Sequence, residues 1–202
     1  MSRSRLWGGM LAAAGALALS VALDPWAWRT LSLAGIYERD WGRMLRVTGS
    51  LVFWAPLALA VWLAMRRAGH PRPGRAALLF WSPALAGGVA ELIKLLIRRE
   101  RPGFADGQYV FRDFAERTWS TSGLGFPTSH GMVAFGGAAV LTGLFPCTAP
   151  VAYAIAAGCA LTRILAGAHF ASDAVGGAIF GWAIGAFLWR RFGGVSTPTG
   201  KA

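Results

Sequence analysis

Long apolar segments separated by short polar ones dominate the sequence. Six of them are long enough, or nearly so, to cross a bilayer as helices, which takes about 20 mainly apolar residues. They are Leu6–Leu23, Val47–Met65, Ala76–Ile97, Gly131–Phe145, Ala149–Leu165 and Ser172–Trp189. In the last of them Gly177, Gly181 and Gly185 repeat at a four-residue spacing that allows helix backbones to approach closely. The pattern predicts an all-α integral membrane bundle of about six transmembrane helices in a single domain, residues 1–202.

A stretch of mixed character, Pro25–Arg46, lies between the first two apolar segments. It carries four arginines together with Trp26, Trp28, Tyr37 and Trp41. Aromatic and basic residues combined in this way are typical of an amphipathic helix that lies in the membrane interface. We expect this helix to anchor the chain, and guiding an anionic lipid headgroup is the alternative role.

The first apolar segment also has the basic start and apolar core of a secretory signal. It is longer than a usual signal core, and the small-residue pattern of a cleavage site is poor ahead of Asp24. We therefore expect this segment to remain in the protein as the first transmembrane helix.

Composition supports a membrane protein and argues against several other classes. Hydrophobic residues make up 55% and charged residues 14% of the 202, and the charged share is about half that of a usual soluble domain. The net charge is nevertheless +11. No Lys/Arg-rich polar helix or known nucleic-acid module accompanies it, so we expect no nucleic-acid partner. Cys147 and Cys159 lack the paired spacing of a zinc or redox site, and no obligate protein partner is evident.

The charges predict an orientation in the membrane. If the N-terminus lies inside and the spans alternate, the inner segments hold nine cations and none of the nine acidic residues. Such a distribution follows the positive-inside rule. These cations are Arg3, Arg5, Arg66, Arg67, Arg72, Arg75, Arg190, Arg191 and Lys201. We therefore expect both termini in the cytoplasm of a bacterium and the opposite helix ends at the periplasmic face of its inner membrane.

Three segments at this outer edge combine cations, histidines and a carboxylate: Lys94–Pro102, Phe126–His130 and Thr162–Asp173. Charge at membrane depth is costly and usually functional. Lys94 and Arg101 are seven residues apart, so a continuing helix puts both on one face before Pro102 ends it.

His169 and Asp173 are four residues apart, which places them on one helix face within reach of a carboxylate–imidazole hydrogen bond. Such a bond fixes the imidazole tautomer and makes the other ring nitrogen a better nucleophile or base. Together with His130 and three of the cations, these groups are expected to meet at one depth. Several cations around a histidine suit a phosphate dianion.

Each feature alone has a simpler explanation. A single Lys or Arg near a helix end is usually an interfacial anchor, and a single histidine on an apolar face is usually a core residue. Histidine and aspartate are also common metal ligands, but His130, His169 and Asp173 would supply only three of them. The nearby cations would in addition repel a metal ion. We therefore predict a site without metal or cofactor.

The three segments resemble, in order and spacing, the signature motifs K-x6-RP, PSGH and SR-x5-H-x3-D of the type 2 phosphatidic acid phosphatase (PAP2) superfamily. The matching positions are Lys94, Arg101, Pro102, Pro127, His130, Arg163, His169 and Asp173. Thr162 replaces the first serine of the third motif, and Thr128 and Ser129 stand where the second has Ser and Gly. The resemblance covers residues 94–173 most strongly and extends to the whole membrane plan.

The resemblance implies a division of roles among the reacting groups. His169 would attack phosphorus and form a phosphohistidine, and Asp173 would orient it. His130 would protonate the leaving oxygen and then activate the hydrolytic water.

The resemblance also implies a phosphate cradle. Lys94, Arg101 and Arg163 would bind the equatorial phosphate oxygens, where charge gathers in the transition state. The Thr128 hydroxyl and the Ser129 backbone N–H would complete it.

The function that this resemblance implies is a membrane-embedded, metal-independent lipid phosphatase. Its substrate would be an anionic lipid of the bilayer: undecaprenyl diphosphate, phosphatidylglycerol phosphate, phosphatidic acid or a lipid A phosphate. The alternatives are a phosphotransferase that passes phosphate to an acceptor other than water, and a non-catalytic lipid-binding or transport protein.

Overall fold

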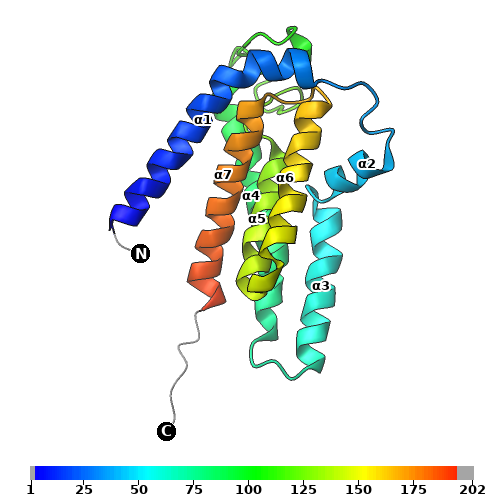
Figure 1. The fold of residues 1–202 in the computed structure, drawn as a ribbon, viewed down its shortest axis with the longest axis vertical. Helices are drawn as coiled ribbons and strands as arrows, with labels where there is room; N and C mark the ends of the chain where they lie inside the picture. Colours follow the sequence, from blue (N-terminus) through cyan, green and yellow to red (C-terminus); the bar gives the residue numbers. More distant parts are fainter. Residues whose placement is uncertain (1–2, 195–202) are drawn as a thin grey trace.

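A computed structural model describes residues 3–194, which form helices and short connections without a β-sheet (Figure 1). The α-helices are α1 (Arg3–Leu31), α2 (Asp40–Val47), α3 (Leu51–Arg67), α4 (Leu78–Ile97), α5 (Ser129–Leu144), α6 (Ala149–Leu165) and α7 (Ala171–Leu188). Short helical turns at Pro73–Ala77, Pro102–Phe104, Pro146–Thr148 and Trp189–Gly193 extend or connect them. The predicted all-α membrane bundle is confirmed.

The helices differ in how clearly each one spans a membrane. The helices α1, α4, α6 and α7 with their flanking turns are long and apolar enough to cross alone. The pair α2 and α3 qualifies only together and bends by 65° at the break, and α5 is apolar but has only 16 residues. The predicted number of six spans is therefore not established by helix length.

The predicted interfacial helix over Pro25–Arg46 is wrong in its bounds. Its first part continues α1 through Pro25 to Leu31, and this end of α1 bends across the end of the bundle (Figure 1). Gly35, with φ +69°, lies in the loop that follows, a conformation that favours glycine. Only the eight-residue α2 remains, with the apolar side chains Trp41 and Met44 exposed and Gly42 buried.

The glycine repeat of α7 packs against α5, as predicted. A Cβ at Gly177 would lie 2.9 Å from the Thr128 carbonyl oxygen, and one at Gly181 would overlap the carbonyl oxygen of Met132. Apolar side chains gain little from leaving lipid for a helix interface, so close backbone packing holds such helices together. The N-terminal ends of α5 and α7, which carry candidate site residues, are therefore held at a fixed separation.

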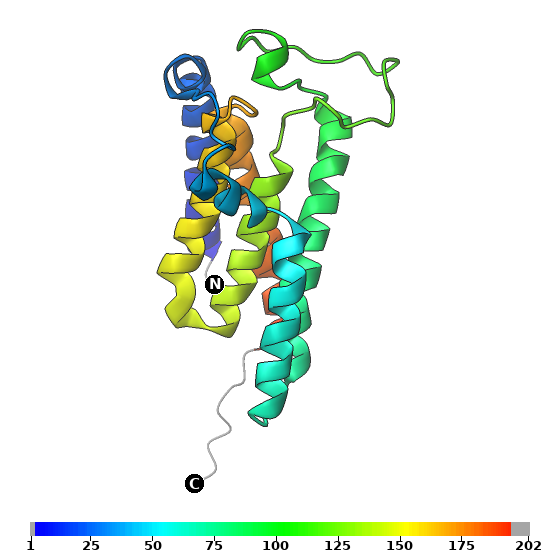
Figure 2. The ribbon, with the colours of Figure 1, turned by 90° about the vertical axis from the view of Figure 1, so that its right-hand side faces the viewer.

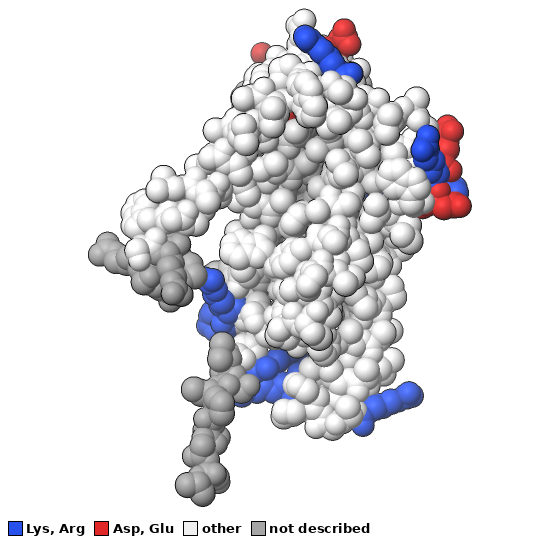
Figure 3. Space-filling view, viewed as in Figure 1, with Lys and Arg blue, Asp and Glu red and all other residues white. Residues whose placement is uncertain are grey.

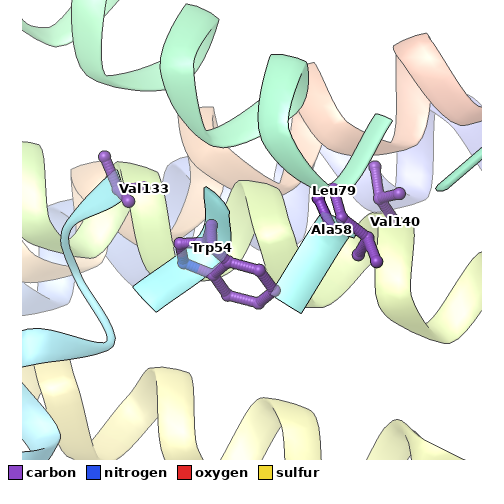
Figure 4. Close-up of a cluster of buried hydrophobic side chains, with 5 residues drawn as sticks. All are labelled: Trp54, Ala58, Leu79, Val133 and Val140. Atoms are coloured by element: carbon purple, nitrogen blue, oxygen red, sulfur yellow. The ribbon is translucent and has the colours of Figure 1, made fainter. Parts of the chain in front are cut away.

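A second contact joins α3, α4 and α5 (Figure 2). Its buried side chains, drawn in Figure 4, are Trp54, Ala58, Leu79, Val133 and Val140. The Trp54 indole Nε1 donates a hydrogen bond to the Thr48 carbonyl oxygen at 2.8 Å. This bond ties the core to the corner between α2 and α3, so the corner has a fixed place beside α5.

Charged side chains are distributed unequally between the two ends of the bundle. In Figure 3 the lower end shows only Lys and Arg, whereas Asp and Glu gather toward the upper end. Six arginines lie at the end of α3, in its connection to α4 and in the turn after α7: Arg66, Arg67, Arg72, Arg75, Arg190 and Arg191. The side chains of the other predicted inner cations, Arg3, Arg5 and Lys201, lie outside the described residues.

Candidate active site

The segment that follows α4 does not continue the helix to Pro102 as predicted. The helix ends at Ile97, because Arg98 adopts a left-handed conformation with φ 58°. The chain then turns into an extended stretch in which Arg99 and Glu100 form isolated bridges with Phe111 and Leu124. Arg101 therefore reaches the site from a loop.

Lys94 remains on α4 and is only 4% exposed. Its ammonium donates hydrogen bonds to Glu91 Oε1 at 2.8 Å and to Ser129 Oγ. The Ser129 hydroxyl in turn donates to the same Glu91 oxygen. The position where glycine was expected thus contributes a hydroxyl beside the predicted phosphate-binding lysine.

The N-terminus of α5 brings Thr128 and His130 to the site. The Thr128 backbone N–H donates to the Asp173 carbonyl oxygen at 3.1 Å, which joins α5 to α7. The Thr128 hydroxyl oxygen is buried without a hydrogen-bond partner among residues 3–194. Gly49 packs so closely on His130 that an added Cβ would lie 2.7 Å from the His130 Cβ. The α2–α3 corner therefore positions this histidine.

His169 and Asp173 make the predicted contact, with Nδ1 and Oδ2 3.3 Å apart. They do not share a helix face, because His169 precedes α7 and Asp173 lies in its first turn. The same Asp173 oxygen accepts the Phe170 backbone N–H at 2.9 Å. With its proton on Nδ1, the imidazole keeps the Nε2 lone pair free.

Burial lowers the pKa of His169 to about 4, although Asp173 acts in the opposite direction and Arg163 and Arg101 add to the lowering. A fully buried imidazole is costly to charge, so its neutral form persists. His169 is thus neutral at physiological pH, as a nucleophile must be.

Arg163 is 4% exposed near the end of α6. Its Nη1 donates to the Tyr37 hydroxyl at 2.7 Å, and its guanidinium lies 5.5 Å from the Tyr37 ring centre. Its Nε is buried without a hydrogen-bond partner in the described chain. Tyr37 comes from the α1–α2 loop, so the segment expected to be an anchor also supports a site residue.

Arg101 and Arg163 form a pair of cations. Burial lowers the pKa of Arg101, and the nearby Arg163 lowers it further. Neither arginine has an ion-pair partner among the described residues. A buried and a half-buried cation that lie close together without carboxylate partners are stabilised by an anion, and the planar guanidinium suits a phosphate.

The predicted residues converge on one place, at the end of the bundle opposite the arginine-rich end. Lys94 interacts electrostatically with Arg101 and Asp173. His130 interacts with His169, Arg163 and Lys94. The site therefore combines two imidazoles, one carboxylate, three cations and an unpaired hydroxyl, which is a set able to bind and transfer a phosphoryl group.

Three groups of the site were not identified from the sequence. Glu91 and Arg99 each form a hydrogen bond with a predicted residue, and Asp24 is connected to Asp173 through Ser172 and Arg99. The signal for Glu91 was an acidic residue inside an apolar segment, and the signal for Asp24 was an acidic residue directly after one. Among residues 3–194 no group of three His, Cys, Asp or Glu side chains lies close enough together to hold a metal ion.

Comparison with known proteins identifies the class. The sequence profile of the PAP2 superfamily matches residues 75–195, more than half of the chain, and the chain therefore belongs to this superfamily. A relative is a lipid A 1-phosphatase of Rhizobium johnstonii, which is 34% identical over 107 residues. The match covers 52% of this chain and only 43% of that relative. No solved structure matches the chain.

Proposed function

We propose that this protein is a metal-independent membrane phosphatase that removes a phosphate group from a lipid phosphate or diphosphate. The observation that carries the proposal is the buried, neutral His169, held by Asp173 and surrounded by cations. Such an arrangement favours attack on a phosphoryl group whose negative charge the cations neutralise.

The first step forms a phosphohistidine. The Nε2 lone pair of His169 attacks phosphorus, and the bond between phosphorus and the lipid oxygen breaks. His130 donates a proton to the departing oxygen, and Asp173 stabilises the charge that develops on His169. Lys94, Arg101 and Arg163 bind the three equatorial oxygens, with Thr128 Oγ1 as a further donor.

The second step releases phosphate. His130, now neutral, takes a proton from water as the water oxygen attacks phosphorus, and the bond to His169 Nε2 breaks. The proton taken from water returns His130 to its protonated starting state, and the release of Nε2 returns His169 to its neutral one. No step requires a metal ion, because the cations take the role of a Lewis acid.

The proposed substrate is a lipid that reaches the site from the bilayer at the periplasmic face of a bacterial inner membrane. Undecaprenyl diphosphate, phosphatidylglycerol phosphate, phosphatidic acid and lipid A phosphates all carry a group that fits. Among these candidate substrates we favour a lipid A phosphate, since the relative is a lipid A 1-phosphatase. Phosphate release measured on a panel of these purified lipids in detergent micelles selects among them.

The test of the chemistry is His169→Ala in the purified protein. We expect phosphate release to fall at least about 10³-fold, because no other group replaces the nucleophile. The matched control is His70→Ala, since His70 is exposed at the opposite end of the bundle. EDTA should leave the rate unchanged. Full activity of His169→Ala, or strong inhibition by EDTA, would contradict the proposal.

A further inference from the structure

A buried arginine outside the proposed phosphate cradle donates a hydrogen bond to the carboxylate that orients His169. Arg99 is 7% exposed, and its Nη2 donates to Asp173 Oδ1 and, at 2.8 Å, to Ser172 Oγ. The other carboxylate oxygen, Oδ2, accepts from His169 and from the Phe170 backbone. The two oxygens of Asp173 are thus divided between Arg99 on one side and the nucleophile on the other.

Three aromatic rings hold the Arg99 guanidinium. The ring centres of Tyr109, Phe126 and Phe170 lie 5.0, 5.1 and 5.1 Å from it, within range of cation–π attraction. Its Nε has no hydrogen-bond partner among the described residues, as expected for an atom enclosed by rings. The cage fixes the plane of the guanidinium and therefore the direction of its bond to Asp173.

A second buried carboxylate supports this arrangement from α1. Asp24 is 1% exposed, accepts the Ser172 backbone N–H at 2.8 Å, and also accepts the Ser172 hydroxyl. The Tyr109 hydroxyl donates to Asp24 at 2.6 Å. Burial, together with Asp24, raises the pKa of Tyr109 to about 12, so the phenol keeps its proton and remains a donor. A continuous chain of contacts thus runs from Asp24 through Ser172 and Arg99 to Asp173.

We propose that Arg99 is a positioning residue for the reaction, and that Asp24 extends this support to α1. The inference rests on the proposed function, since it concerns the orientation of the same nucleophile. A carboxylate whose Oδ1 is held by a fixed guanidinium presents its other oxygen, Oδ2, to His169 Nδ1 in one geometry. A displacement of about 1 Å in such a group costs roughly 100-fold in rate.

The first experiment compares Arg99→Gln with Arg98→Gln. Arg98 is also buried, but it donates hydrogen bonds to carbonyl oxygens of the loop between α4 and α5, including those of Arg112 and Asp113. We expect kcat of Arg99→Gln to fall about 100-fold, while the inhibition constant of inorganic phosphate stays within about threefold. Arg98→Gln should keep kcat within about threefold, whatever its thermal stability.

Any of three results of this comparison would overturn the inference. One is an Arg99→Gln protein whose kcat stays within about threefold of wild type. Another is a loss of phosphate inhibition as large as that of Arg101→Gln, which would make Arg99 a direct phosphate ligand. Equal losses in kcat for both variants would also overturn it, because they would reveal a general effect on folding.

A pH profile separates positioning from a merely structural role. Charged and titratable groups facing His169 and Asp173 are Lys94, Arg99, Arg101, His130 and Arg163. Without the Arg99 charge, Asp173 stabilises the imidazolium form of His169 more strongly. The acid limb of kcat/KM should therefore move to higher pH in Arg99→Gln and stay in place in Arg99→Lys. A limb that stays in place in Arg99→Gln would contradict the inference.

The conservative variant keeps the test decisive if Arg99→Gln does not fold. Arg99→Lys should lose about tenfold in kcat with unchanged phosphate inhibition, because the charge remains but the planar fork is lost. Asp24→Asn should lose about tenfold as well, whereas Asp40→Asn, an exposed control, should not. Normal kcat in both Arg99→Lys and Asp24→Asn would refute the positioning role of Arg99 and leave the proposed function unaffected. An active His169→Ala would refute the proposed function itself.

Discussion

Ser129 occupies a position where the signature motif has glycine, and its hydroxyl lies between Lys94 and Glu91. In the absence of substrate, Lys94 is thus held by two groups that compete with phosphate. We predict that Ser129→Gly binds inorganic phosphate about fivefold more tightly, which corresponds to about 1 kcal/mol for one competing hydrogen bond. The inhibition constant of phosphate measures this effect.

Ser129→Ala is the matched control, because it removes the hydroxyl and keeps the Cβ. If the hydroxyl competes for Lys94, both variants should bind phosphate more tightly. Improvement in Ser129→Gly alone would instead show that the Cβ crowds the phosphate. Weaker binding in both would mean that the hydroxyl is itself a ligand of the phosphate, and the prediction would be wrong.

The pKa of His169, lowered to about 4 mainly by burial, predicts how the rate depends on pH. The neutral imidazole is the nucleophile, so the acid limb of kcat/KM should appear as the pH drops through about 4 and His169 takes a proton. Asp173 raises the pKa of His169 against this effect. Asp173→Asn should therefore move the acid limb to lower pH while reducing kcat.

Both proteins in this comparison are assayed on the same lipid, so ionisation of the substrate phosphate affects them equally. His130, Arg101 and Arg163 also face His169 and are unchanged in the variant. An acid limb that moves upward in Asp173→Asn would contradict the assignment of that limb to His169.

The sequence identified the candidate reacting residues but not most of their supports. Motif spacing located His169 and Asp173, and their contact is confirmed. Arg99 and Asp24 were not identified as site residues, because their partners lie 74 and 148 positions away in the chain. Such contacts follow from how the helices pack, which local spacing does not determine.

Among the elements, helices within apolar segments were predicted well and the polar connections were not. The bounds Ala149–Leu165 of α6 agree with the sequence prediction. The seven-residue spacing from Lys94 to Arg101 indicated a longer α4, but the left-handed Arg98 ends that helix at Ile97. Hydrophobic length sets the extent of a span, whereas a single backbone conformation decides where a polar end turns.

The contact between α5 and α7 makes a prediction at the scale of elements. Gly181→Ala places a Cβ against the backbone of Met132, which has no flexible end to move aside. We expect a loss of about 1–3 kcal/mol in stability, seen as a lower Tm in detergent. Activity should fall too, because the same helices carry Thr128 and Asp173.

The control for this change is Gly88→Ala on α4, where an added Cβ would meet nothing within 4 Å. Alanine is the better helix former there, so Tm should stay the same or rise slightly. If Gly181→Ala leaves Tm at the value of Gly88→Ala, the glycine repeat is not needed for the close approach of the two helices.

For the whole molecule, the charge distribution predicts the side of the membrane on which each end lies. Cys147, in the turn between α5 and α6, is exposed at the arginine-rich end, and Cys159 is buried in α6. Positive residues favour the cytoplasmic side. In spheroplasts that express the protein, a membrane-impermeant maleimide should therefore label Cys147 only after permeabilisation.

Ala115→Cys, made in a Cys147→Ser background, provides the opposite test, because residue 115 is exposed in the outer loop beside the candidate site. Intact spheroplasts should be labelled at this position, while Cys159 stays unlabelled in both preparations because it is buried. The two labelling patterns together would place His169 and the proposed phosphate cradle on the periplasmic side, where a lipid of the outer leaflet reaches them. Labelling of Cys147 in intact spheroplasts, with protection of residue 115, would reverse the orientation and require the substrate to come from the cytoplasmic leaflet.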